Sequence, residues 1–155
     1  MKRNIFEARA NILPYEYPQL LAYKDAIRHS YWIDTEYNFT TDIDDFRVKV
    51  TEEEREVIKR TMLAIAQIEV NVKTFWADLY KRMPITEIGD VGMTFAESEV
   101  RHKDAYARLL RILGLEDEFR TVVDIPAIKG RIAYLKKYLD GSRSKDNKMY
   151  AKSVL

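Results

Sequence analysis

The chain has 155 residues, and its 26 basic and 25 acidic side chains leave a net charge of +1, which excludes the strong positive field of proteins that bind nucleic acid or anionic membranes. Hydrophobic residues make up 46%, typical of one folded domain with its own core, yet no apolar run approaches the ~20 residues that cross a bilayer. The absence of cysteine excludes disulfides, thiolate metal ligands and cysteine nucleophiles, and it agrees with the cytoplasmic location that we expect.

The first fifty residues are predicted to hold one short helix. Residues 1–17 are expected to be irregular, and the helix follows Pro18 because proline is tolerated in a first helical turn. His29 is expected on the surface of this helix, without a functional role. Residues 33–50 are rich in Asp and Thr, and we predict a loop there. The inward side of the helix is predicted to carry Leu21, Ile27 and Tyr31.

A second helix is predicted from a capping box. Thr51 and Glu54 have the Thr-x-x-Glu spacing in which each side chain caps the other's backbone N–H. The helix should run to about Lys81 and stop before Pro84. A carboxylate, Glu69, replaces a hydrophobic residue in the middle of its apolar face. That face reads Ile58, Met62, Ile65, Glu69, Val72 and Trp76.

The third predicted helix ends at Gly114, since glycine favours the left-handed conformation at a helix C-terminus. Steps of three and four residues keep its apolar positions on one face. Three ionisable residues, Glu99, His102 and Tyr106, occupy this face, although burial of a charge without a partner is costly. The whole face reads Ile88, Val91, Phe95, Glu99, His102, Tyr106, Leu109 and Leu113.

The last part of the chain is predicted to hold one more complete helix. A short acidic turn precedes it, Asp124 and Pro126 start it, and Gly141 closes it. Residues 142–147 are expected to be a polar linker, and 148–155 a helix that has only begun. A domain seldom ends on an apolar first turn, so we expect the N-terminal part of a longer protein. The inward positions of the complete helix are Ile128, Ile132, Leu135 and Leu139.

The ionisable residues of the second and third helices form a candidate metal site. Glu99 and His102 are one turn apart, ~4.5 Å along the axis, and Glu69 faces them if the two helices pack antiparallel. A carboxylate-rich set with one imidazole suits iron or manganese better than copper. Helix bundles build dimetal sites from two single Glu residues and two Glu-x-x-His pairs, so this chain holds three of the six protein ligands.

Each of these residues also has an ordinary interpretation. A Glu-x-x-His pair often faces solvent, and Glu69 would reach water if its helix were rotated. Tyr106 is either a core tyrosine or a redox-active phenol, which an apolar pocket would protect. Trp32 and Trp76 are large apolar fillers by default. Two groups complete these expectations: a pocket of Phe95, Leu109 and Leu110, and a solvated pair of Glu97 with Arg101.

Taken together, three motifs resemble the small, radical-generating subunit of class I ribonucleotide reductase. The resemblance covers essentially the whole chain and corresponds to the N-terminal half of that family's polypeptide. It implies an all-α, ferritin-like helical bundle, a dimetal site of two iron ions, manganese or both, and a tyrosyl radical. It also implies a partner, the large catalytic subunit, in which ribonucleotide reduction begins. The motifs are Tyr31-Trp32-Ile33-Asp34, Gln67-Ile68-Glu69 and Ser98-Glu99-Val100-Arg101-His102-Lys103-Asp104-Ala105-Tyr106.

The resemblance also assigns roles to individual residues. It makes Glu69 the first carboxylate ligand, at a position where many members carry Asp, and Glu99 the bridging carboxylate. His102 becomes the imidazole ligand of the same metal. Tyr106 becomes the radical site, and Trp32 the first relay for the electron that leaves the cluster.

Half of the family's ligand set is missing from residues 1–155, which we expect to form a single domain. A complementary C-terminal fragment would supply the missing ligands, or two copies would pair, since doubling two Glu and one His gives the full set. Two other functions remain open at this point. One is another ferritin-like dimetal oxidase or iron-binding protein, and the other is a metal-free helical interaction module whose buried acids pair with a partner.

Overall fold

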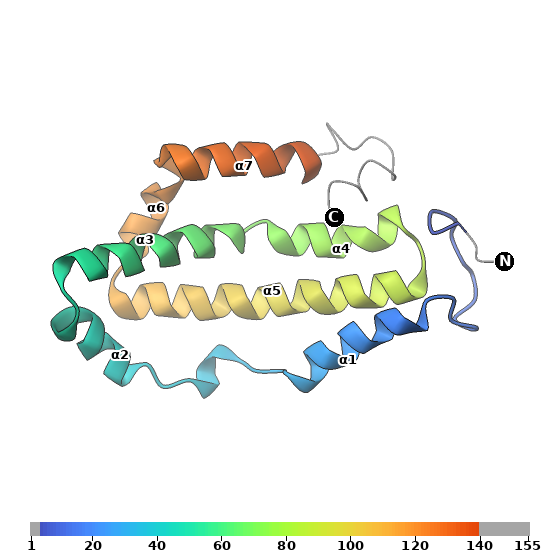
Figure 1. The fold of residues 1–155 in the computed structure, drawn as a ribbon, viewed down its shortest axis with the longest axis horizontal. Coiled ribbons are helices and arrows are strands. Elements are labelled where there is room, and N and C mark those ends of the chain that lie inside the picture. The colour runs from blue at the N-terminus through green and yellow to red at the C-terminus, as the bar shows by residue number, and fades with distance from the viewer. Residues whose placement is uncertain (1–3, 140–155) are drawn as a thin grey trace.

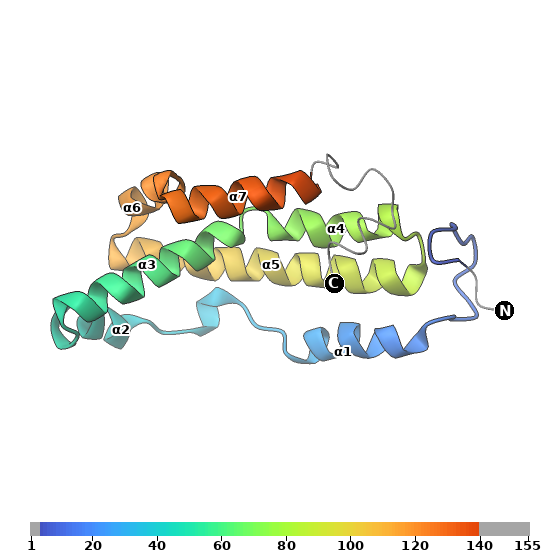
Figure 2. The same cartoon turned by 45° about the horizontal axis from the view of Figure 1, so that its top comes forward.

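The computed structural model describes residues 4–139, and this part of the chain is helical without strands. Figures 1 and 2 show α3 and α4 end to end beside the long α5, with α1 on the other side of α5 and α7 on the far side of α3 and α4. No described helix combines the length and apolarity needed to span a bilayer. The helices are α1 Leu21–His29, α2 Thr40–Asp44, α3 Glu52–Ile68, α4 Val72–Arg82, α5 Thr86–Leu113, α6 Glu116–Thr121 and α7 Pro126–Leu139, with short turns of other helix types at Pro18–Leu20, Asp34–Glu36, Asp45–Lys49 and Val122–Asp124.

Several predicted helix ends are confirmed. The N–H of Glu54 donates to Thr51 Oγ1 at 3.3 Å and the N–H of Thr51 donates to Glu54 Oε2 at 2.8 Å, so the capping box at the start of α3 is complete. Gly114 ends α5 in the left-handed region, with φ 72°. Pro126 opens α7. His29 is exposed at the end of α1, as expected.

The predicted second helix is in fact two. Its chain leaves the α-helical path at Glu69–Asn71, where the N–H groups of Val70 and Asn71 donate to carbonyls only three residues back, at 3.3 and 3.1 Å. The Lys73 ammonium donates to the carbonyl oxygens of Glu69 and Val70 at 2.8 and 3.1 Å. The lysine thereby satisfies acceptors that the interrupted helix leaves open. The apolar spacing continues across the break, which is why the pattern predicted one helix.

Other predicted boundaries were wrong. The expected loop at 33–50 contains α2 and two short helical turns, and the expected acidic turn after Gly114 is α6. Asp124 ends a 3₁₀ turn and does not open α7, and Tyr31 lies beyond the end of α1. Short polar helices of this kind carry too few periodic positions to show in the sequence. The expected helix end at Gly141, the linker at 142–147 and the last helix lie outside the described residues.

The main core lies where α3, α5, α6 and α7 meet. On α3 the buried apolar residues are Leu63 and Ala66, whereas Ile58 and Ile65 of the predicted face are each 37% exposed. The inward face of α3 is therefore rotated from the predicted one. Ile128 of α7 is buried as expected, with Ile132 packed beside it. The core cluster consists of Leu63, Ala66, Leu110, Leu115, Val122 and Ile128.

α4 and α5 approach each other closely at a glycine. A Cβ on Gly92 would lie 2.6 Å from the carbonyl oxygen of Trp76, closer than real Cβ contacts. Only glycine allows this approach without a shift of backbone. The antiparallel packing of α4 on α5 thus brings Trp76 and the break at Glu69 against the middle of α5.

A buried ion pair fastens the N-terminal segment to the start of α5. The Arg9 guanidinium pairs with the Glu87 carboxylate, and the two side chains are 3% and 0% exposed. Glu87 Oε1 also accepts from the backbone N–H groups of Glu16 and Tyr17, at 2.7 and 3.2 Å. Burial alone would raise the pKa of Glu87, but the hydrogen bonds from its own N–H, Arg9, Tyr17 and Glu16 outweigh burial and hold that pKa below 4.5.

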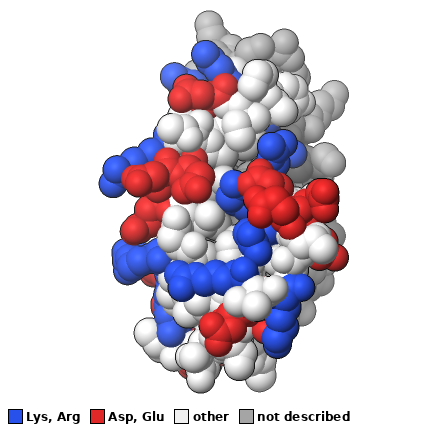
Figure 3. Space-filling model, turned by 90° about the vertical axis from the view of Figure 1, so that its left-hand side faces the viewer, with Lys and Arg blue, Asp and Glu red and all other residues white. Residues whose placement is uncertain are grey.

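Acidic and basic side chains are interspersed at the end of the molecule formed by α2, α6 and the start of α3 (Figure 3). No field of one sign covers this face, in keeping with the net charge of +1. The ion pairs of this region are Lys49–Asp45, Arg55–Glu52, Arg111–Glu116 and Arg120–Asp117.

Candidate metal centre

The three predicted ligands lie together. Glu69 sits at the break between α3 and α4, and Glu99 and His102 lie one turn apart on α5. One ligand atom from each residue lies within 4.8 Å of the others. His102 Nδ1 is 2.9 Å from Glu99 Oε2 and 3.9 Å from Glu69 Oε1. The interpretation in which Glu69 reaches water is wrong, because Glu69 is only 7% exposed.

The carboxylate of Glu69 is buried beside a second carboxylate, and both features change its pKa. Burial, followed by the hydrogen bond and negative charge of Glu99, raises the pKa of Glu69 to about 7, although His102 and Lys73 act in the opposite direction. Glu69 Oε2 is buried and has no hydrogen-bond partner among the described residues. A buried carboxylate oxygen normally has a partner, and a metal ion would provide one. The donor set of two carboxylates and one imidazole fits iron or manganese.

Trp76 is more than the apolar filler that the sequence indicated. Its Nε1–H donates to Glu99 Oε1 at 3.0 Å, while Glu99 Oε2 lies beside His102. The ring of Trp76 stacks on Phe95, with centroids 4.5 Å apart and an interplanar angle of 25°. Trp76 therefore fixes the orientation of the carboxylate, as residues around metal ligands commonly do. The only signal in the sequence was its place on the same predicted face as Glu69.

Tyr106 lies one turn beyond His102 and packs against the main core cluster. Burial, with a smaller contribution from the charge of Glu69, raises the pKa of its phenol above 10. Leu110, one of the expected pocket residues, belongs to the cluster that Tyr106 contacts. Phe95 does not, since it stacks on Trp76 about 16 Å along the helix from Tyr106.

Trp32 is placed directly against His102, one of the three predicted ligands. Its ring stacks on the His102 imidazole, with centroids 5.7 Å apart and an interplanar angle of 19°. Tyr37 meets the same indole edge-on at 5.6 Å. The stacking joins the segment that follows α1 to the middle of α5.

The expected solvated pair of Glu97 and Arg101 is only half correct. The pair forms, with Arg101 Nε 2.9 Å from Glu97 Oε2, but Arg101 is 5% exposed. Its guanidinium lies over the rings of Tyr31 and Trp32, at 4.5 and 5.7 Å from their centroids. The sequence places Arg101 beside His102, but nothing in the periodicity indicates burial of a charge there.

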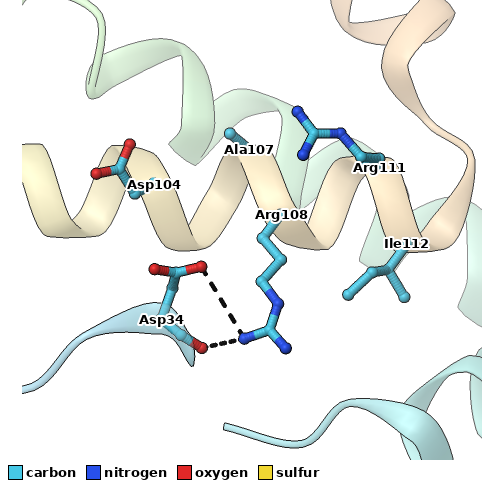
Figure 4. Close-up of a pocket in the computed structure, with 6 residues that line it drawn as sticks. All are labelled: Asp34, Asp104, Ala107, Arg108, Arg111 and Ile112. Atoms are coloured by element: carbon cyan, nitrogen blue, oxygen red, sulfur yellow. Dashed lines mark hydrogen bonds and ion pairs between the residues drawn. The ribbon is translucent and has the colours of Figure 1, made fainter. Parts of the chain in front are cut away.

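A surface pocket of about 490 Å³ lies further along α5. Arg108 reaches across it, donating to the Asp34 carbonyl and lying 3.9 Å from its carboxylate (Figure 4). The same guanidinium lies 5.2 Å from the ring centroid of Phe39. Arg108 thereby ties the turn that follows Trp32 to α5. The pocket is lined by Asp34, Asp104, Ala107, Arg108, Arg111 and Ile112.

The family described as "Ribonucleotide reductase, small chain" matches residues 9–155. This chain belongs to the ribonucleotide reductase small-chain family. A probable ribonucleoside-diphosphate reductase small subunit of Invertebrate iridescent virus 6 is 25% identical over 141 residues, which cover 88% of this chain and 39% of the relative. A second such protein, of Invertebrate iridescent virus 3, is 24% identical over 109 residues, or 70% of this chain and 29% of the relative.

The resemblance of the motifs to this family is therefore confirmed, and with it the all-helical, ferritin-like architecture. The chain spans well under half the length of the curated relatives it matches, 39% and 29%.

Proposed function

We propose that this chain supplies one half of the dimetal-carboxylate centre of a ribonucleoside-diphosphate reductase small subunit. Glu69, Glu99 and His102 would be the ligands that hold the ions. The observation that carries this proposal is the buried, unpartnered Oε2 of Glu69 beside Glu99 and His102. Family membership supplies the reaction class.

Each residue of the centre has a distinct task. Glu69 and Glu99 would neutralise the metal charge, and Trp76 holds Glu99 in place through its indole N–H. When bound, the two ions, iron or manganese or one of each, supply the strongly oxidising chemistry that a phenol radical requires. Tyr106 holds its proton firmly because its surroundings are apolar and Glu69 is near. It is the radical site, and Trp32 on His102 is the relay.

The proposal includes two kinds of partner. The radical passes from Tyr106 through the relay Trp32 to the large catalytic subunit. The remaining three ligands come from a complementary C-terminal segment or from a second copy of this chain, because a dimetal carboxylate site takes six protein ligands.

Titration with Mn²⁺ tests the proposal. Electron paramagnetic resonance of the free ion measures the affinity for manganese. Native mass spectrometry of the same mixtures gives the number of ions bound per chain. Glu69→Ala, Glu99→Ala and His102→Ala should each weaken binding at least tenfold. Glu116→Ala, an exposed acid on α6, is the matched control and should leave binding unchanged.

The outcomes separate the functions. Equal binding by the wild type and all three ligand variants would overturn the metal centre and favour a metal-free interaction module. Metal binding without a phenoxyl radical signal, once the complementary half is added together with iron and dioxygen, would favour another ferritin-like oxidase or an iron-binding protein. The stacking of Trp32 on His102 favours the reductase, since a metal store needs no relay.

A further inference from the structure

Trp32 lies in a stretch whose backbone does not fix its ring. Residues 31–33 have no regular secondary structure, between Ser30 at the end of α1 and the turn that starts at Asp34. A side chain in such a stretch keeps one orientation only if other side chains hold it. The nearly parallel stacking on His102 therefore needs a cause outside this segment.

Arg101 provides three contacts to this segment. Its Nη1 donates to the Trp32 carbonyl oxygen at 3.3 Å. Its guanidinium lies 5.7 Å from the Trp32 ring centroid and 4.5 Å from that of Tyr31. One residue of α5 thus holds the backbone and the ring of Trp32, while the next residue, His102, stacks on that ring.

Arg101 is itself held in place. Its Nε donates to both carboxylate oxygens of Glu97, one turn earlier on α5, at 3.1 and 2.9 Å. The Arg101 side chain is 6% exposed and the Glu97 side chain 49%. A buried guanidinium is costly unless its donors and charge are satisfied, and these partners satisfy both. The fixed planar shape of the guanidinium suits a group that must meet two rings and a carbonyl.

We infer that Arg101 is a positioning residue, anchored by Glu97, that holds the Trp32 indole against His102. The functional meaning of this contact rests on the proposed role of Trp32 as the relay; the contact itself does not. Arg101 does not act as a ligand or touch the ions. It sets the distance and angle between the relay ring and the imidazole ligand.

Fluorine spectroscopy of the metal-free chain tests this role. The chain has two tryptophans, so 5-fluorotryptophan labelling gives two signals, which Trp32→Phe and Trp76→Phe assign. In Arg101→Met, a substitution of similar length without charge, the Trp32 signal should move toward the position of free 5-fluorotryptophan. The Trp76 signal should stay, because Trp76 contacts α5 through Glu99 and Phe95.

Three further variants make the test specific. Arg111→Met removes an exposed charge from the same helix and should leave both signals unchanged. Arg101→Lys keeps the charge without the planar fork and should restore the Trp32 signal only in part. Glu97→Gln keeps Arg101 but weakens its anchor. It should move the Trp32 signal in the same direction as Arg101→Met does, by a smaller amount. It tests the inference even if Arg101→Met does not fold.

The inference would be overturned by an unmoved Trp32 signal in Arg101→Met that remains folded by circular dichroism, or by an unmoved signal in Glu97→Gln. A Trp32 signal that moves equally in Arg111→Met would also overturn it. These measurements use no metal, so they fail independently of the Mn²⁺ titration. Absence of Mn²⁺ binding by the wild type, together with the expected movement of the Trp32 signal in Arg101→Met and Glu97→Gln, would contradict the proposed function alone.

Discussion

Single side chains determine how the carboxylates of the centre point, and Trp76 is the clearest case. Its indole N–H fixes one oxygen of Glu99, while the other oxygen lies beside His102. Residues that hold metal ligands from outside commonly account for a tenfold to hundredfold part of the affinity.

Trp76→Phe should therefore weaken Mn²⁺ binding about tenfold, because phenylalanine keeps the stacking on Phe95 but lacks the donor. Titration of the variant beside the wild type measures the difference. Tyr80→Phe, on the same helix and 42% exposed, is the control and should bind as the wild type does. Unchanged affinity in Trp76→Phe would show that Glu99 needs no such support.

The approach of α4 to α5 depends on a glycine. Gly92→Ala would place a methyl group 2.6 Å from the Trp76 carbonyl oxygen, so the backbone must move apart. We expect a loss of about 1–3 kcal/mol in the free energy of unfolding. Weaker Mn²⁺ binding should accompany it, because Trp76 moves away from Glu99. Chemical denaturation and metal titration measure the two effects.

Gly89→Ala is the matched comparison for Gly92→Ala. The atoms nearest to its new Cβ are Cδ2, Cγ and Cε2 of the Tyr80 ring, at 2.4, 2.9 and 3.0 Å, so a side chain that is 42% exposed must shift and not the backbone. The loss of stability should be smaller than in Gly92→Ala, with metal affinity retained. A larger loss of stability in Gly89→Ala than in Gly92→Ala would mean that the backbones of α4 and α5 move apart at a lower cost than the Tyr80 ring shifts.

The pairing of Glu87 with Arg9 should make the attachment of the N-terminal segment sensitive to acid. The pKa of Glu87 in the folded chain lies below its ordinary value of 4.5, so its stabilisation is complete above about pH 4.5 and is lost as the pH falls through the folded-state pKa. At neutral pH, Glu87→Gln should lower the free energy of unfolding by about 3 kcal/mol, because Arg9 stays buried and keeps only the longer contact with Glu16, at 3.8 Å.

Denaturation curves between pH 3 and pH 7 check the prediction for Glu87. The difference between wild type and Glu87→Gln should shrink toward the acid end. Glu116→Gln, at an exposed acid, gives the background slope. A difference that stays constant with pH would show that Glu87 acts by packing and not by its charge.

The sequence predicted the helices that carry long apolar repeats or local capping signals. Thr51, Gly114 and Pro126 act through contacts within one turn, so their effect is visible in the chain itself. Short helices such as α2 and α6 depend on distant neighbours and escaped prediction. The break at Glu69–Asn71 is stabilised by Lys73, a residue whose role no repeat reveals.

The candidate site was predictable for a different reason. Glu69, Glu99 and His102 stand out because ionisable residues interrupt apolar faces, and their convergence followed from antiparallel packing. Trp76 and Arg101 were misread because a tryptophan in a core and an arginine beside a glutamate have common, ordinary interpretations. Only their partners in space, Glu99 for Trp76 and Trp32 for Arg101, distinguish the roles.

Binding at the centre should stabilise the entire fold, since the ligands come from segments that are separated in the unfolded chain. Free Mn²⁺ at about one hundred times its dissociation constant should add about 2.7 kcal/mol, equivalent to a rise of about 5–10 °C in Tm. Differential scanning calorimetry measures the rise. His102→Ala should show almost none, and an equal rise in that variant would place the bound metal elsewhere.

The interruption between α3 and α4 makes Glu69 a pivot. No continuous hydrogen-bonded ladder stiffens the joint, since the bonds at Val70 and Asn71 span three residues. Small torsional adjustments in this joint can tilt the carboxylate toward an ion without unwinding either helix. On one side of the joint α3 packs into the main core, and on the other side α4 carries Trp76. A tilt of the Glu69 carboxylate would therefore change the angle between α3 and α4.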